Sequence, residues 1–146
     1  MNLDSHCYDL YQSYYALTHK VLLDCPSKKL LVDSINQFKY PIASHTLSDI
    51  PIFNYANEAM LKLFEMKHHE FIGLPSDQSA SKKHQEERRH LLAQVKLKGF
   101  IENYQGYRVK KNGDTFLIKK ATVWNVLDHL GEMHSQAVII FDWQDY

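Results

Sequence analysis

Nine histidines and two cysteines are the side chains best suited to bind a metal, but their spacing does not form a metal site. His68 and His69 are adjacent and cannot point at one ion from a helix, and His84 and His90 lie six residues apart, on different helix faces. No His-Glu-x-x-His or Cys-x-x-Cys sequence is present. The chain also lacks a Gly-x-Ser-x-Gly motif and a glycine-rich phosphate loop. We therefore predict no metal site and no enzymatic activity.

Six polar or aromatic residues are better candidates for contacts to a small ligand. They are Tyr55, Asn57, Tyr104, Arg108, Trp124 and Asn125. The turn at residues 54–57 joins an apolar segment to an amphipathic one, which would place polar side chains at the edge of a sheet. A buried Trp124 would need a partner for its indole N–H, and a ligand is one such partner. We predict that the six residues line one ligand site.

Each candidate also has an ordinary structural interpretation. Asn57 is well placed to cap the following helix through its side-chain oxygen. Trp124 can fill the core without any ligand, since pockets are few in a protein. A partly buried Arg108 requires a carboxylate, either from Glu102 or Asp142 or from an acidic ligand. An exposed Arg108 would need only an ion pair across the strands.

Two helices are expected to precede the strands. Apolar residues recur at helical spacing over residues 5–23, with Asp4 or Ser5 as the N-cap. Pro26 ends this segment, and Ser27 is expected to cap a second helix to about Phe38. The first helix is rich in aromatic residues, which are enriched at subunit contacts: Tyr8, Tyr11, Tyr14 and Tyr15. We therefore predict a homodimer formed through the N-terminal helices.

From residue 40 onward the pattern changes to strands interrupted by helices. Residues 41–46 and 50–55 predict a hairpin, and residues 57–66 and 81–97 predict helices. Three further strands are expected over 100–110, 115–127 and 134–143, and the first two are joined at Asn112-Gly113, a strong hairpin signal. This order predicts an α+β fold with a five-stranded antiparallel sheet and crossover helices on one face. We divide the chain into a helical extension (1–39) and a sheet domain (40–146).

Three segments in this order resemble the MEKHLA domain, a PAS-like family. They are residues 51–65, 99–108 and 121–128, and the resemblance covers roughly residues 10–143. MEKHLA domains occur as stand-alone bacterial proteins and at the C-terminus of plant homeodomain-zipper regulators. The resemblance implies a sensory or signalling module, and we expect it to bind a small molecule or a protein partner between the sheet and the crossover helices. The alternative is a ligand-free interaction or dimerisation domain.

The resemblance does not name a cofactor. PAS relatives that bind haem use a helical histidine, so His84 or His90 would be the iron ligand if haem were bound. Relatives that bind flavin covalently use a cysteine in the crossover helices, whereas Cys7 and Cys25 both precede the sheet. We therefore expect no covalent flavin chemistry.

Composition narrows the class further. The 146 residues suffice for one domain, and their 45% hydrophobic and 23% charged content is that of a globular protein. Lys plus Arg and Asp plus Glu number 17 each, so nothing indicates a nucleic-acid partner. No apolar run is long enough to span a membrane, and the N-terminus does not resemble a signal peptide. A cytoplasmic location with free cysteines is the expectation.

Overall fold

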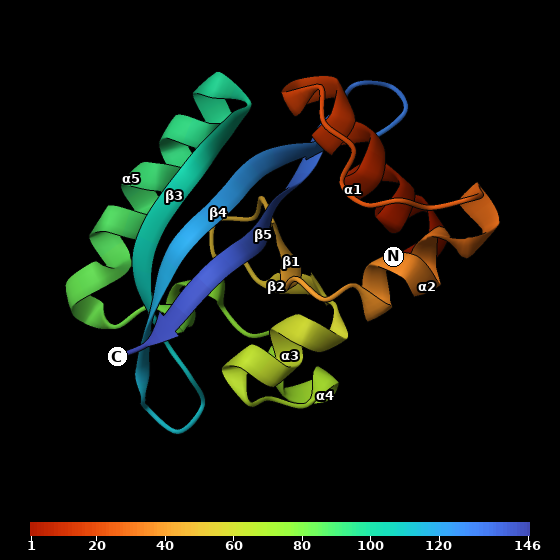
Figure 1. Cartoon of the computed structure of the whole chain (residues 1–146). Coiled ribbons are helices and arrows are strands. Elements are labelled where there is room, and N and C mark those ends of the chain that lie inside the picture. The colour runs from red at the N-terminus through yellow and green to blue at the C-terminus, as the bar shows by residue number, and fades with distance from the viewer.

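The computed structural model describes all 146 residues, which fold into helices on both sides of one sheet (Figure 1). The N-terminal part contains α1 (Leu3–Thr18), the 3-10 turn η1 (Lys28–Leu30) and α2 (Leu31–Gln37). The hairpin strands β1 (Ile42–Thr46) and β2 (Phe53–Ala56) follow. The crossover consists of α3 (Glu58–Phe64), α4 (His68–Phe71), the 3-10 turn η2 (Ser76–Ser79) and α5 (Lys82–Lys98). The chain ends in β3 (Phe100–Val109), β4 (Thr115–Leu127) and β5 (Met133–Asp145).

The five strands form one sheet in the order β2-β1-β5-β4-β3, and every neighbouring pair is antiparallel. The last strand therefore lies in the centre, between the first hairpin and the β3–β4 pair. The predicted α+β fold with a five-stranded antiparallel sheet is confirmed.

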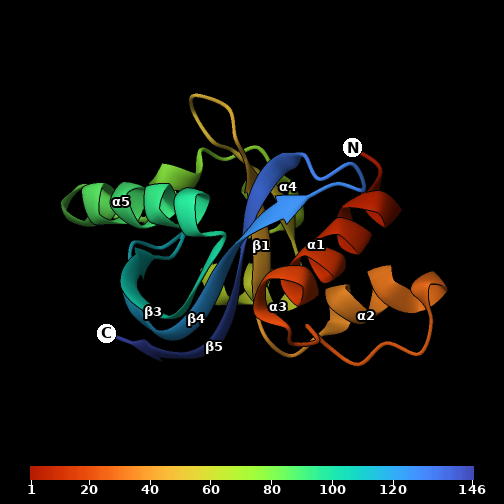
Figure 2. The same ribbon diagram turned by 90° about the horizontal axis from the view of Figure 1, so that it is seen from above.

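Helices cover both faces of the curved sheet (Figure 2). One core lies between the sheet and α3, α4 and α5, and contains Met60, Phe64, Phe71, Leu91 and Phe116. A second core lies between the other face and α1 and α2, and contains Leu10, Tyr14, Ile35 and Trp124 among others. We call these the crossover core and the N-terminal core. Because α1 and α2 have a core of their own, residues 1–39 pack closely on the sheet.

An irregularity in β4 decides which side chains enter each core. Phe116 and Ile118, at even positions, belong to the crossover core. The register with β5 shifts on both sides of Lys120, and beyond it Trp124, also at an even position, belongs to the N-terminal core. A bulge exchanges the two faces of a strand because side chains alternate with a period of two. Simple alternation along β4 therefore misplaces Trp124.

The ends of the first two helices differ from the prediction. Asn2, rather than Asp4 or Ser5, caps α1 by accepting a hydrogen bond from the Ser5 amide at 3.0 Å. The helix ends at Thr18 instead of near residue 23, because His19 has a left-handed backbone with φ of 60°. The Ser27 side chain makes no capping hydrogen bond. The apolar periodicity continues beyond Thr18 because Leu22 and Leu23 are buried in the core, although both lie in the loop after the helix.

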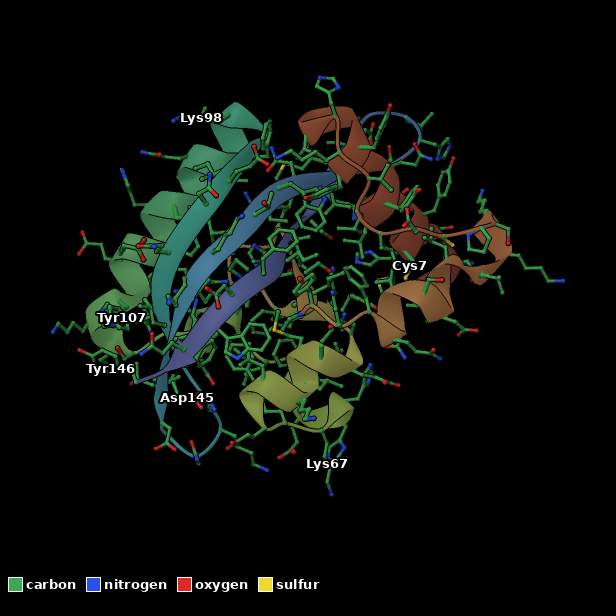
Figure 3. All side chains as sticks on the ribbon, in the orientation of Figure 1. Cys7, Lys67, Lys98, Tyr107, Asp145 and Tyr146 are labelled. Carbon is green, nitrogen blue, oxygen red and sulfur yellow. The ribbon has the colours of Figure 1, made fainter.

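Cys7 and Cys25 are both free thiols. Cys7 lies buried in the N-terminal core, on the α1–α2 side of the molecule (Figure 3). None of the helices combines the length and apolar character needed to cross a bilayer.

Candidate ligand site

A small cavity of about 60 Å³ lies in the crossover core, between the sheet and the crossover helices. Thirteen of its nineteen lining residues are hydrophobic, and they include Phe53, Phe71 and Ile140. Its polar lining comes from several elements and includes Arg88 of α5, Tyr104 and Arg108 of β3, His45 of β1 and Gln136 of β5, with Ser44 and Ser79 as the remaining polar residues. An apolar cavity with a few convergent polar groups is the usual form of a small-molecule site.

The structure brings only two of the six predicted residues to this cavity. Tyr104 and Arg108 line it. Tyr55 and Trp124 lie across the sheet in the N-terminal core, so our expectation that all six share one space needs correction. Asn57 and Asn125 make hydrogen bonds to backbone groups and do not line the cavity.

The backbone of β3 is irregular where it presents Tyr104. Asn103 has a left-handed backbone with φ of 57°, and the register with β4 shifts on both sides of Tyr104. Gly106 leaves room for the ring, since a Cβ atom at this position would clash with the Tyr104 hydroxyl oxygen. Bulges often re-aim a side chain near a functional site. Here they direct Tyr104 and Arg108 into the crossover core.

Arg108 is buried, which excludes the alternative of an exposed ion pair across the strands. Its Nη1 donates to the Tyr107 carbonyl at 2.8 Å and its Nη2 to the Tyr104 hydroxyl oxygen at 3.1 Å. Neither carboxylate considered from the sequence reaches it, because Glu102 pairs with Lys20 and Asp142 lies near Lys119. The positive charge of Arg108 therefore has no carboxylate within the chain in direct contact.

A second buried arginine, Arg88 of α5, was not among the predicted site residues and lies beside Arg108 at the cavity. Arg88 donates from Nη1 to Asp77 Oδ1 at 3.3 Å and from Nη2 to His45 Nδ1 at 3.4 Å. Burial, followed by the positive charge of Arg108, lowers the pKa of Arg88 to about 10. Arg88 is still a cation at neutral pH. The sequence signal for its burial is its spacing, because Arg88 lies three and seven residues before Leu91 and Val95, the other buried residues of α5.

His45 is a neutral hydrogen-bond link between α5 and the sheet. Since Arg88 can only donate, His45 Nδ1 accepts and Nε2 carries the proton, which it donates to Gln136 Oε1 at 3.2 Å. Burial, and then the positive charge of Arg88, lowers the pKa of His45 to about 4. Gln136 donates in turn to the Leu92 carbonyl at 3.0 Å and to Asn125 Oδ1 at 3.3 Å. This network fastens α5 to β1, β4 and β5.

The structural alternative for Asn57 is confirmed, because its amide makes four hydrogen bonds that join α2, β1 and α3. Its oxygen accepts from the Met60 and Ile42 amides at 3.0 and 2.9 Å. Its Nδ2 donates to the Ile35 and Tyr40 carbonyls at 3.1 and 3.0 Å. The side chain is fully buried and has no group left for a ligand.

Tyr55 and Trp124 are buried without hydrogen-bond partners for the phenol oxygen and the indole nitrogen. Burial raises the pKa of the Tyr55 phenol, and the adjacent Cys7 raises it further. The Trp124 ring packs edge-on against Tyr14 with centroids 5.0 Å apart. Both rings fill space between α1 and the sheet.

A chain of polar side chains on the N-terminal side of the sheet was not predicted. Its members are His6 and Asp9 of α1 together with Ser44, Asn54, His134 and Ser135 of the sheet. Ser44 Oγ donates to Asn54 Oδ1 at 2.5 Å, so it accepts from His6 Nε2 at 2.8 Å. Asn54 Nδ2 donates to Ser135 Oγ at 3.1 Å. These hydrogen-bonded polar side chains fasten the start of α1 to β1, β2 and β5.

At the far end of the polar chain, Ser135, His134 and Asp9 are hydrogen-bonded in the order of a Ser-His-Asp triad. Ser135 Oγ lies 2.9 Å from His134 Nδ1, and His134 Nε2 lies 2.8 Å from Asp9 Oδ2. Ser135 is fully buried and its oxygen already accepts from Asn54, so the hydroxyl is not presented to a substrate. The arrangement is therefore a structural link. Its residues lie up to 125 positions apart, and no spacing rule could have found it.

The remaining candidate ligands for metal or haem lie away from the cavity. His84 is 3.1 Å from the Ser81 hydroxyl, and His90 is 3.0 Å from Gln94 Nε2. Neither histidine lines the cavity. No group of three or more His, Cys, Asp or Glu side chains is arranged to hold a metal ion.

The sheet order and the crossover helices packed on one face of the sheet define a PAS-like α+β domain. The chain belongs to the MEKHLA domain family, whose model matches residues 4–145 and so includes the N-terminal helices. No curated protein sequence matches the chain.

Solved structures with this fold include sensory domains of low sequence identity. The PAS domain of a protein from Colwellia psychrerythraea has a TM-score of 0.67 at 15% identity, over 81% of this chain and 95% of that one. An RNA-binding light-oxygen-voltage receptor has a TM-score of 0.67 at 14% identity, over 83% of this chain and 37% of the receptor. A variant of Vivid has a TM-score of 0.56 at 16% identity, over 70% and 81%. At this level of sequence identity, these structural similarities establish the fold of the chain.

A flavin, as studied in one light-oxygen-voltage structure with this fold, does not fit the residues present here. The cavity of about 60 Å³ has room for only a few water-sized groups. Neither Cys7 nor Cys25 lines it, so no thiol is available for a covalent bond to a flavin ring.

Proposed function

We propose that this protein is a sensory module that binds a small molecule in the cavity between the sheet and α5. The observation that carries the proposal is the cavity itself, whose walls are apolar and whose polar lining includes the buried residues Arg88, Tyr104 and Arg108. Binding there, rather than catalysis, is its function.

The proposed signal leaves through β1 and β5. His45 and Gln136 are register partners on these strands and face the cavity. The neighbouring residues Ser44 and Ser135 belong to the polar chain that holds α1 on the opposite face. A ligand that prefers one position of these strands would shift the population of α1 positions by its difference in affinity.

Native mass spectrometry tests ligand binding with a matched pair of variants. Leu92→Trp adds bulk at the cavity, whereas Leu97→Trp makes the same change on the exposed side of α5. We expect the wild type and Leu97→Trp to retain a small-molecule mass that is released on unfolding, and Leu92→Trp to lose it. The same retained masses in all three proteins would refute binding in this cavity.

A ligand-free interaction domain is the second candidate, favoured by the small size of the cavity. Phe64 packs edge-on against Phe116 with centroids 5.2 Å apart and so fills much of the crossover core. Under this alternative the wild type would retain no small molecule, and Leu92→Trp would leave complex formation intact.

A homodimer through α1 in the cytoplasm belongs to the same proposal. Tyr14 is used within the N-terminal core, which leaves Leu3 and Tyr15 as the exposed apolar side chains on the outer face of α1. Size-exclusion chromatography with light scattering should give a dimer that Tyr15→Lys dissociates. A monomer at micromolar concentration would remove this part of the proposal.

A further inference from the structure

Two arginine side chains are buried together at the cavity. Arg88 is 5% exposed and Arg108 is 7% exposed, and both line the cavity. The positive charge of Arg108 disfavours that of Arg88 and, after burial, helps to lower the pKa of Arg88. Burying like charges side by side destabilises a fold unless an opposite charge accompanies them.

The carboxylates nearby balance these two charges only in part. Asp77 is the one carboxylate in contact with Arg88, and it is shared with Arg89, whose Nη2 lies 2.9 Å from its other oxygen. Glu87 accepts a hydrogen bond from the Tyr104 hydroxyl at 3.1 Å and so reaches Arg108 only through that phenol. Both carboxylates lie on the solvent side, whereas the guanidinium groups are buried.

The two buried arginines also have N–H donors without a hydrogen-bond partner in the protein. Each guanidinium carries five N–H donors. Arg88 uses two, to Asp77 and His45, and Arg108 uses two, to Tyr107 and Tyr104. The other polar groups at the cavity are already engaged: the His45 acceptor is occupied, Gln136 Oε1 accepts from His45, and the Ser79 and Ser44 hydroxyls bond to the Ser76 carbonyl and to Asn54. The site therefore has a surplus of positive charge and of donors facing an apolar space.

We propose that the cavity binds a short organic acid, with its carboxylate on Arg88 and Arg108 and its apolar body among Phe53, Phe71 and Ile140. This inference rests on the proposed ligand-binding function and adds the chemical class of the ligand. A carboxylate matches the planar donor pattern of guanidinium groups and supplies the missing charge. A cavity of about 60 Å³ limits the body to a few carbon atoms, whereas an inorganic anion would leave the apolar walls without contacts.

Isothermal titration calorimetry with three probes tests the charge and the apolar body separately. Sodium butyrate has both features, butyramide keeps the shape without the charge, and sodium phosphate has only charge. We expect butyrate to bind at least about tenfold more tightly than butyramide, because ionic hydrogen bonds to arginine are the stronger kind. Phosphate should bind more weakly than butyrate by a similar factor.

Arg108→Met is the decisive variant, and Lys83→Met removes a positive charge from the exposed side of α5 as its control. We expect Arg108→Met to lower the affinity for butyrate about tenfold and to leave the affinity for butyramide unchanged. Its melting temperature should be equal or higher, since an unbalanced buried charge is replaced by an apolar chain. Arg88→Met should lower the affinity for butyrate in the same way, and Lys83→Met should bind butyrate as the wild type does.

The outcomes separate this inference from the proposed function. If butyrate and butyramide bind equally and both lose affinity in Leu92→Trp, the cavity binds small molecules but the assignment to acids is wrong. Phosphate binding as tightly as butyrate would also overturn that assignment. If none of the probes binds the wild type and no mass is retained on purification, both the inference and the proposed function fail.

Discussion

Mild acid should destabilise this protein through two buried histidines, His6 and His45. His6 lies at the start of the polar chain under α1, and His45 links Arg88 to Gln136. Burial lowers the pKa of each to about 4 from an ordinary value of 6.5, with the charge of His134 acting second on His6 and that of Arg88 on His45.

The direction of the pH effect on stability follows from which state, folded or unfolded, binds the proton. Between pH 6.5 and 4 the unfolded chain protonates these imidazoles and the folded protein does not, so stability is complete above pH 6.5 and decreases as the pH falls toward 4. Between about pH 7.5 and 5 each histidine should therefore account for a loss of roughly 2 kcal/mol in the free energy of unfolding. Glu70 and Asp128, whose pKa values are lowered, contribute only at more acidic pH.

Urea unfolding at the two pH values, followed by far-UV circular dichroism, measures the loss. We expect the wild type to lose roughly 4 kcal/mol, and His6→Gln and His45→Gln each to lose about half as much. The exposed His69 provides the control, since His69→Gln should leave the pH dependence as in the wild type. If neither buried-site variant reduces the pH dependence, the neutral hydrogen-bonding roles assigned to these two residues are wrong.

Three further predictions concern single side chains. Asn57→Ala should lower the free energy of unfolding by about 3–5 kcal/mol in urea, because four hydrogen bonds to buried backbone groups are lost; a loss below about 1 kcal/mol would contradict this. Tyr55→Phe should leave ligand binding unchanged and stabilise the protein by about 1 kcal/mol, since the hydroxyl is buried without a partner. Weaker ligand binding in this variant would show that Tyr55 belongs to the ligand site. Gly106→Ala should displace the Tyr104 ring, lower the melting temperature and weaken butyrate binding. An unchanged melting temperature together with unchanged butyrate affinity would refute the close approach of the Tyr104 ring to Gly106.

The sequence by itself determined the order and type of the elements. Gly99 and Asn112-Gly113 lie where a helix and a strand end, because such residues have local conformational preferences that hold in any context. Asn57 was identified as a helix cap for the same reason, since capping depends on residues three positions apart. Periodicity in the strands then led to the antiparallel α+β fold.

Only the tertiary structure decided which side chains meet. The shift in β4 around Lys120 moved Trp124 to the opposite face of the sheet, and the rotation of α5 buried Arg88 within an otherwise charged segment. The contact between Asp9 and His134 likewise depends on how α1 docks on the finished sheet. These features arise from packing between distant segments, and a bulge of one residue or a small helix rotation reverses them. For that reason Arg108 could be predicted as a ligand-site residue from the sequence, whereas its position next to Arg88 became visible only in the folded protein.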